Sequence, residues 1–322
     1  MRDIILADGL ERILTLELAR VTEAAAIAAY EQIGRGNEND ADQAAVDAMR
    51  KALNQCNFDG TVVIGEGERD EAPMLFIGEK VGTGKGPKVD IALDPLEGTT
   101  LTAKAMANAL AVVAVAEGGS LLNSPDTYMD KIAIGGGYPE GVVDLDADPR
   151  DNILALAKAK GVPPREITAC ILDRSRHSTL IAKVREAGAA VALISDGDIA
   201  GVIHCAKPET GIDMYLGSGG APEGVLAAAA LKCVGGQFQG RLVLRNDEER
   251  IRAKQAGIED LKRRYELNDL VSGAAVFIAT GVTSGSLLEG VRISRGEVQT
   301  HTMVLNCASG ASMELKTRER VQ

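Results

Sequence analysis

The amino-acid sequence predicts an α/β protein with two fused subdomains. Its 322 residues are 45% hydrophobic and 25% charged, which is enough apolar chain for two cores. Beyond about residue 145, apolar runs of strand length alternate with runs of helical periodicity, as expected of an α/β layer with parallel strands. No Pro- or Ser-rich linker separates the two halves. We therefore expect residues 1–145 and 146–322 to pack closely against each other.

The first half is expected to combine two long helices with buried strands. Helical spacing of apolar residues predicts helices over residues 10–30 and 40–55. The strand that starts at Lys88 is expected to end at Pro95, which lacks a backbone donor. Apolar runs predict strands at residues 61–64, 88–94, 109–116 and 128–135.

The second half is expected to continue with alternating helices and strands. A Gly-rich segment at 216–225 leads into an Ala-rich helix that ends near residue 234. The segments after this Ala-rich helix are interpreted as structural scaffold. Helices are expected at 148–160, 177–187 and 247–267, and strands at 167–172, 190–195, 275–280 and 291–313.

Two acids, Asp94 and Glu97, stand at the carboxyl end of the strand that begins at Lys88. Gly98 allows a close turn, Thr99 can cap the next segment, and free N–H groups there would suit a phosphate. Carboxylates beside an anion site need a cation between them, and Mg²⁺ or Mn²⁺ prefers such oxygen ligands. The alternative is an ordinary acidic turn after a strand.

Further acids lie in positions from which they can join this cluster. Glu66 follows the strand at 61–64 within a loop rich in glycine and acids, and Glu223 falls in the first turn of the Ala-rich helix. Asp42 lies near the start of the second helix, where capping and the helix dipole are the alternative explanation. Glu66, Asp94, Glu97 and Glu223 are therefore candidate metal ligands, with Glu68, Asp70 and Glu71 in reserve.

Charged loops also follow two strands of the second half. Arg174 and Arg176 follow one strand and could grip a phosphate, while Asp196 and Asp198 follow the next and could accept sugar hydroxyls. A solvated basic turn and a helix cap are the alternatives. His177 is expected to cap or pack, because no nucleophile elbow accompanies it.

Composition excludes several classes of protein. A net charge of −11 and the lack of Trp argue against a nucleic-acid partner. No apolar run is long enough for a membrane span and no secretory signal is recognised, so we expect no membrane partner and a cytoplasmic location. The five scattered cysteines indicate reduced packing residues rather than disulfides or a zinc site.

The motif Asp94-Pro-Leu-Glu-Gly-Thr99, together with Gly65-Glu-Gly-Glu68 and Gly219-Gly-Ala-Pro-Glu-Gly-Val225, resembles class II fructose-1,6-bisphosphatases. These belong to the lithium-sensitive, metal-dependent phosphatase superfamily. Similarity extends from about residue 10 to residue 290. The resemblance implies a layered α/β/α/β/α sandwich of the fructose-1,6-bisphosphatase and inositol phosphatase type, and a homo-oligomer, either a dimer or a tetramer.

The resemblance also assigns roles to individual residues. Asp70 corresponds to an acid that assists the chemistry, and Arg174-Ser175-Arg176 stands where many relatives have Lys-Pro-Arg. The metal ligands implied are Asp42, Glu66, Asp94, Glu97 and Glu223. The substrate contacts implied are Glu97, Gly98, Thr99, Tyr128, Arg174, Ser175, Arg176, Asp196, Gly197, Asp198 and Gly220.

The resemblance implies hydrolysis of the 1-phosphate of fructose 1,6-bisphosphate. Two or three Mg²⁺ or Mn²⁺ ions would neutralise the phosphate and lower the pKa of a water, which Thr99 and Glu66 would orient. Asp70 would help to move the proton, and Arg174 and Arg176 would hold the distal phosphate. The alternatives are a sedoheptulose-1,7-bisphosphatase or dual enzyme, an inositol monophosphatase-like enzyme, and a silent phosphosugar-binding protein.

Overall fold

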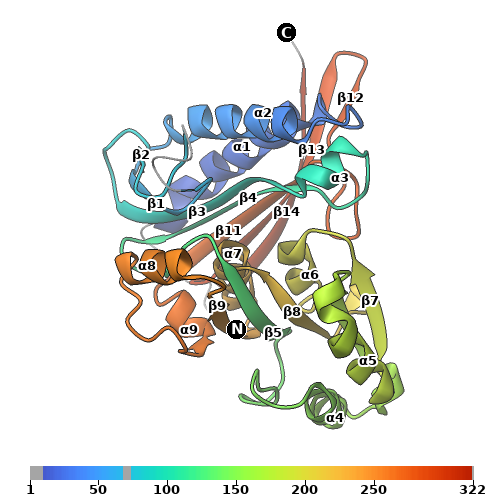
Figure 1. The fold of residues 1–322 in the computed structure, drawn as a ribbon. Coiled ribbons are helices and arrows are strands. Elements are labelled where there is room, and N and C mark those ends of the chain that lie inside the picture. The colour runs from blue at the N-terminus through green and yellow to red at the C-terminus, as the bar shows by residue number, and fades with distance from the viewer. Residues whose placement is uncertain (1–9, 68–73, 321–322) are drawn as a thin grey trace, which may run out of the picture. The chain divides into compact units, whose positions relative to one another are not determined.

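The computed structural model describes residues 10–67 and 74–320 and confirms the α/β fold class (Figure 1). The chain forms two compact units. Unit 1 contains Met1–Leu122 and Val271–Gln322, and unit 2 contains Asn123–Leu270. This division differs from the expected boundary near residue 145. The physical reason is that a strand near the C-terminus, Ala275–Gly281, pairs along its whole length with Leu110–Glu117.

Unit 1 is built on one mixed sheet with the strand order β12-β13-β11-β4-β3-β1-β2, and β14 pairs with β13. Helix α1 packs across β11, β13 and β4, and α2 packs against β3 and α3 (Figure 1). The strands are β1 (Asp59–Ile64), β2 (Lys80–Val81), β3 (Lys88–Glu97), β4 (Leu110–Glu117), β11 (Ala275–Gly281), β12 (Arg292–Ser294), β13 (Glu297–Asn306) and β14 (Ala311–Arg320). The helices are α1 (Leu10–Tyr30), α2 (Glu38–Leu53) and α3 (Thr99–Ala103).

A row of buried hydroxyl groups fixes α1 to this sheet. Thr22 of α1 lies 2.7 Å from Thr280 of β11, whose hydroxyl lies 2.8 Å from that of Thr302 of β13. The next residue, the buried Glu23, accepts hydrogen bonds from Thr300 at 2.8 Å and from Thr317 at 2.9 Å. Buried polar groups are stabilising only when they are paired, so these contacts select one position of the helix on the sheet.

Unit 2 is built on a second sheet with the order β10-β9-β5-β8-β6-β7, in which β6 runs parallel to both β7 and β8. The expected βαβ alternation is confirmed there. The strands are β5 (Tyr128–Ile134), β6 (Thr168–Leu172), β7 (Ala190–Ile194), β8 (Met214–Gly220), β9 (Gln237–Val243) and β10 (Tyr265–Glu266). The helices are α4 (Pro149–Lys160), α5 (Ser178–Glu186), α6 (Asp198–His204), α7 (Ala221–Cys233), α8 (Asp247–Gln255) and α9 (Leu267–Leu270).

Two features of unit 2 follow directly from sequence. Helix α7 packs on β5, β8 and β9 and is buried on nearly all sides, which its alanines allow. Helix α8 ends at Gln255 rather than near residue 267, so the expected length was wrong. Gly257 adopts a φ of +85°, and a left-handed residue directly after a helix ends its hydrogen-bond ladder.

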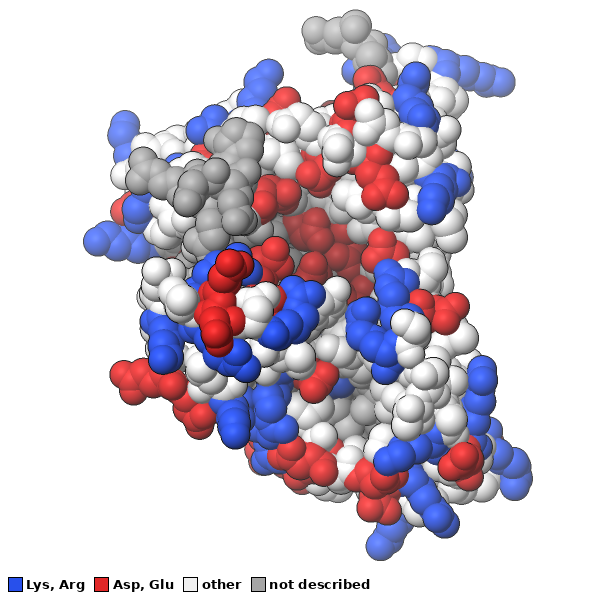
Figure 2. Space-filling model, in the orientation of Figure 1, with Lys and Arg blue, Asp and Glu red and all other residues white. Residues whose placement is uncertain are grey.

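The described helices include none with the combined length and apolar character required to cross a lipid bilayer. Basic side chains are scattered over the surface seen in Figure 2, whereas acidic side chains also gather near the middle of that view. Among the described residues in that view, the basic groups form no continuous surface of the kind that binds a nucleic-acid backbone.

A buried ion pair joins the central strand of unit 2 to α6. The Nζ atom of Lys131 on β5 lies 2.5 Å from Oδ2 of Asp198, and their side chains are 0% and 7% exposed. The hydroxyl of Tyr215 donates to the same oxygen at 3.5 Å. A Cβ atom at Gly219 would lie 2.0 Å from this oxygen, so only glycine fits there. Both charged groups are therefore buried, and each is stabilised by the opposite charge of the other.

We expect Lys131→Met to lower the free energy of unfolding by about 3–5 kcal/mol, because it leaves the Asp198 carboxylate buried without its cation. Urea denaturation followed by circular dichroism measures this. The matched control is Lys183→Met, which breaks an ion pair with Asp148 in which both side chains are 44% exposed. That change should lower the free energy of unfolding by less than about 1 kcal/mol. Equal effects of the two substitutions would contradict the role given to the buried pair.

Candidate functional site

A β-bulge brings the two acids of the central motif together. On β3, Asp94 faces Val112 and Glu97 faces Leu110, so three steps along β3 match two along β4. The expectation that the strand ends at Pro95 was wrong, because β3 continues to Glu97. Proline is tolerated at a bulge, where the ladder does not require its missing N–H. Carboxylate oxygens of Asp94 and Glu97 lie within 4.8 Å of each other.

The residues around the bulge fix the directions of these side chains. The backbone N–H of Leu96 donates to Oδ1 of Asp94 at 3.1 Å. Gly98 then turns the chain with a φ of 88° into α3, which begins at Thr99. A Cβ atom at Gly98 would lie 2.7 Å from the Leu101 side chain, so the turn requires glycine. Glu97 is 4% exposed, whereas Asp94 is half-buried.

The arrangement of strands places Glu66 at the same edge of the sheet. Strands β1 and β3 are parallel, and Ile64 at the end of β1 pairs with Ala92 of β3. Glu66 and Asp94 therefore each lie two residues beyond this last pair. The backbone N–H of Glu66 donates to the carbonyl of Leu75 at 3.0 Å, which fixes the loop after β1. The carboxyl ends of parallel strands share one edge of a sheet.

Asp42 lies within α2, which packs against β3 and α3. Asn37 caps this helix by accepting a hydrogen bond from the N–H of Asp40, so capping does not explain Asp42. Burial raises the pKa of the Asp42 carboxyl. Among the described residues of unit 1, the tight acidic group contains Asp94 and Glu97 but neither Asp42 nor Glu66. Asp70, expected to assist the chemistry, lies outside the described residues.

The chemistry of this acidic group suits a hard cation. Two carboxylates whose oxygens lie within 4.8 Å repel each other when both are ionised. A divalent ion bound by both oxygens removes the repulsion, and Mg²⁺, Mn²⁺ and Ca²⁺ all prefer such ligands. The residues present therefore fit a metal centre at the end of β3.

In unit 2, the loop after β6 holds two arginines in fixed positions. Nη1 of Arg174 donates to the carbonyl of Ser195 at 2.5 Å, and its Nη2 lies 3.9 Å from the carboxylate of Asp196. Nε and Nη2 of Arg176 both donate to the carbonyl of Ser218, at 3.1 and 2.7 Å. Arg174 is thus anchored to the segment after β7 and Arg176 to β8, so neither guanidinium group is freely solvated. Ser175 lies between them and is exposed.

The buried His177 holds this loop in place through both of its ring nitrogen atoms, which confirms the expectation that it packs. The N–H of Ser218 donates to Nε2 at 2.8 Å, so the ring proton lies on Nδ1, which donates to the carbonyl of Leu172 at 2.7 Å. Burial lowers the pKa of His177 and so favours this neutral form. His177 therefore holds the N–H of Ser218 while Arg176 holds its carbonyl.

The two acids that follow β7, Asp196 and Asp198, lie in different surroundings. Gly197, with a φ of 81°, turns the chain into α6. Asp196 is half-buried beside Arg174, whereas Asp198 is buried and bound to Lys131. Asp196 is thus the more exposed of the two acids, and the expectation that both accept sugar hydroxyls stays a prediction.

Gly220 and Glu223 form the start of α7. A Cβ atom at Gly220 would lie 1.8 Å from Oε2 of Glu223, so glycine is required for the carboxylate to fold back over the first turn. Gly220 pairs with Tyr128 across β5 and β8. The predicted contacts Gly220, Tyr128 and Arg176 of unit 2 are thus brought to one end of its sheet, since the Arg176 guanidinium lies 4.9 Å from the centre of the Tyr128 ring.

Two charged residues of this region were not identified from the sequence. Lys131 interrupts an apolar strand, which is a detectable signal, since a lysine is rarely buried without a partner. Arg245 lies 4.4 Å from the centre of the Tyr128 ring. It stands in a charged segment that was interpreted as scaffold, and no local pattern distinguishes it from its neighbours.

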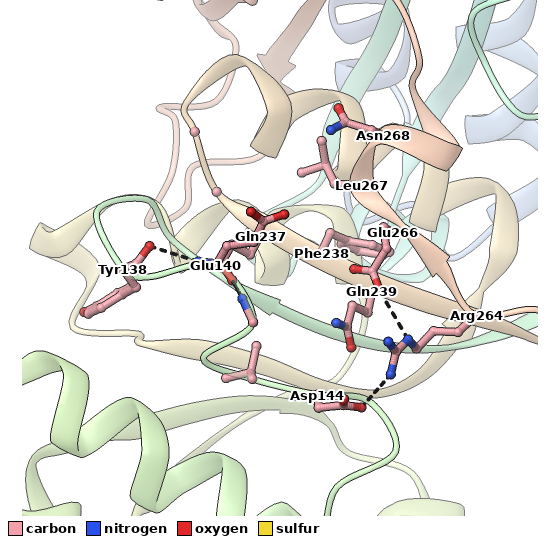
Figure 3. Close-up of a pocket in the computed structure, with 14 residues that line it drawn as sticks. Tyr138, Glu140, Asp144, Gln237, Phe238, Gln239, Arg264, Glu266, Leu267 and Asn268 are labelled. Atoms are coloured by element: carbon pink, nitrogen blue, oxygen red, sulfur yellow. Dashed lines mark hydrogen bonds and ion pairs between the residues drawn. The ribbon is translucent and has the colours of Figure 1, made fainter.

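Unit 2 also contains a pocket of about 620 Å³ that includes none of the predicted residues (Figure 3). Arg264 projects into it but is bound to Asp144 at 2.8 Å and to Glu266 at 3.2 Å. Its cation is therefore already neutralised. A smaller pocket of about 470 Å³ is lined by Arg176, His177 and Ser218 and so adjoins the predicted phosphate-binding loop.

Comparison with known proteins identifies relatives of this chain. The model of the family described as bacterial fructose-1,6-bisphosphatase, glpX-encoded, matches residues 12–319. The chain is 47% identical over 310 residues to fructose-1,6-bisphosphatase 1 class 2 of Escherichia coli K12, covering 92% of each chain. The class 2 fructose-1,6-bisphosphatases of Escherichia coli O6:H1 and Shigella flexneri match with the same 47% identity and 92% coverage. This chain therefore belongs to the glpX-encoded family of bacterial fructose-1,6-bisphosphatases.

Proposed function

We propose that the protein hydrolyses the 1-phosphate of fructose 1,6-bisphosphate to give fructose 6-phosphate and phosphate, a step of gluconeogenesis. The observation that carries the proposal is the carboxylate pair of Asp94 and Glu97 in a member of this phosphatase family. A metal-dependent phosphatase needs closely spaced oxygen ligands.

The metal in this proposal is Mg²⁺ or Mn²⁺, held by Asp94 and Glu97 and further by Asp42, Glu66 and Glu223. When bound, the ions would neutralise phosphate charge and lower the pKa of a water molecule. Glu66 and Thr99 would orient the attacking water, while the N–H groups at Gly98 and Thr99 would hold phosphoryl oxygens. Asp70 would help to move the proton.

The distal part of the substrate would be held by unit 2. Arg174 and Arg176 present guanidinium groups suited to a phosphate, and their anchoring reduces the entropy lost on binding. Tyr128, Ser175, Gly220 and the Asp196-Gly197-Asp198 loop would contact the sugar and this phosphate. On family resemblance, we also propose a homodimer or homotetramer and a cytoplasmic location.

Replacing Asp94 with Asn or Glu97 with Gln should lower kcat by more than about 100-fold, because even outer-shell partners of a metal ligand contribute 10- to 100-fold. Phosphate release from fructose 1,6-bisphosphate measures the loss, and titration calorimetry with Mn²⁺ alone measures metal affinity. The matched control is Glu117→Gln at the exposed end of β4, which should retain both properties. Wild-type turnover in either motif variant would rule out the proposed centre.

Removal of divalent ions by a chelator should abolish phosphate release, and restoring Mg²⁺ or Mn²⁺ separately shows which ion the protein uses. The same assay with sedoheptulose 1,7-bisphosphate and inositol 1-phosphate measures the substrate preference. Full activity in the chelator would exclude a metal-dependent reaction.

Arg176→Ala should raise KM for fructose 1,6-bisphosphate about 10- to 100-fold, corresponding to the roughly 1.5–3 kcal/mol of a charge-assisted hydrogen bond. Arg165→Ala is the control, since Arg165 is 78% exposed and pairs only loosely with Glu166 at 3.8 Å. An unchanged KM in Arg176→Ala would instead favour a monophosphatase-like enzyme, which has no distal phosphate to bind.

A further inference from the structure

Two arginines from distant segments of unit 2 lie over the same tyrosine ring. The Cζ atoms of Arg176 and Arg245 are 4.9 and 4.4 Å from the centre of the Tyr128 ring. Arg176 comes from the loop after β6, and Arg245 comes from the segment between β9 and α8. Tyr128 pairs with Val243 of β9, two residues before Arg245, so the sheet itself sets this approach.

The two guanidinium groups are anchored in the same manner. Nε and Nη2 of Arg176 donate to the single carbonyl oxygen of Ser218. Nε and Nη2 of Arg245 donate to Oε1 of Glu249, at 2.8 and 2.6 Å. In both residues the anchor occupies the edge that carries Nε and Nη2, so the edge that carries Nη1 is turned away from the anchor. Each cation thus has a fixed orientation before any ligand arrives.

Glu249, which orients the Arg245 guanidinium, is itself buried and held by further hydrogen bonds. Its side chain is only 1% exposed, although Arg245 is 53% exposed. Its Oε2 accepts the backbone N–H of Arg245 at 2.6 Å and the hydroxyl of Thr127 at 3.0 Å. The hydrogen bond from Arg245 lowers the pKa of Glu249 to about 2, so the carboxylate remains ionised at neutral pH. Most ion pairs on a protein surface contribute little to stability, and such a pair does not require a partner that is buried to this degree.

The Glu249 carboxylate balances the charge of Arg245, whereas Arg176 is anchored by the neutral carbonyl of Ser218. The two guanidinium groups and their anchors therefore carry a net positive charge that a further anion would balance. The ring face attracts each cation, but this attraction is only about 0.5–1 kcal/mol at exposed sites. A phosphate monoester offers three oxygens and up to two negative charges, and can accept from both arginines at once. Bidentate recognition of this type suits guanidinium better than ammonium.

We propose that Arg245 binds the phosphate remote from the bond that is cleaved, alongside Arg176, and that Glu249 is the positioning residue that orients it. The inference rests on the proposed function, because it assigns a further contact to the same sugar bisphosphate.

The test compares Arg245→Gln and Glu249→Gln with Arg250→Gln. Arg250 is the matched control, because it is an arginine of the adjacent helix α8, is 48% exposed and pairs with Asp247, which is 93% exposed. KM and kcat are measured with fructose 1,6-bisphosphate and with fructose 1-phosphate, which lacks the distal phosphate. Thermal unfolding of each variant is recorded in parallel.

Arg245→Gln and Glu249→Gln should raise KM for the bisphosphate by at least tenfold, with an effect on fructose 1-phosphate at least fivefold smaller and with little change in kcat. Arg245→Lys should recover part of the affinity, because it restores the charge without the planar fork. Arg250→Gln should match wild type. Equal changes for both substrates, or none, would overturn the proposal.

Binding of fructose 6-phosphate, measured by calorimetry, separates this inference from the proposed function, since that ligand carries only the distal phosphate and needs no turnover. Absence of wild-type hydrolysis would refute the proposed function alone. The inference would be refuted if Arg245→Gln bound fructose 6-phosphate as tightly as wild type, or if wild type did not bind it.

Discussion

The repulsion between the Asp94 and Glu97 carboxylates is the constraint on which unit 1 depends. An unsupported chain would separate these groups, but β3 is paired on one side with β1 and on the other with β4. The bulge at Pro95 gives the spacing, and the hydroxyl contacts of α1 hold the sheet that carries it. The fold thus maintains a local arrangement of charge that a bound cation would stabilise, a common feature of functional sites.

In unit 2, the predicted phosphate-binding residues are positively charged arginines, and they are held in place differently from the acids of unit 1. The arginines of unit 2 are oriented by single oxygen atoms, the carbonyl of Ser218 and the carboxylate of Glu249. The neutral ring of His177 adds no further positive charge, and its two nitrogen atoms bond the backbone. The charges of each unit suit the ligand proposed for it, a metal ion for the carboxylates of unit 1 and a phosphate for the guanidinium groups of unit 2.

The sequence predicts those parts of the structure that depend on local patterns. Strands followed by acidic or basic loops could be located, and parallel pairing of β1 with β3 explains why Glu66 and Asp94 share an edge. Non-local pairing leaves no such pattern. Nothing near residue 275 indicates that β11 returns to β4, and nothing near Arg245 indicates that β9 carries it to Tyr128. Pro95 suggested the end of a strand because the bulge that accommodates it becomes evident only with its partner strand.

The return of the chain to unit 1 has a consequence for the order of folding during synthesis. Strand β11 lies between β4 and β13 in the first sheet, yet it leaves the ribosome after the whole of unit 2. The nascent strand β4 must therefore wait with one open edge while Asn123–Leu270 completes its own sheet. An open apolar edge invites pairing with other chains, so we expect the growing chain to be prone to aggregation until β11 pairs with β4.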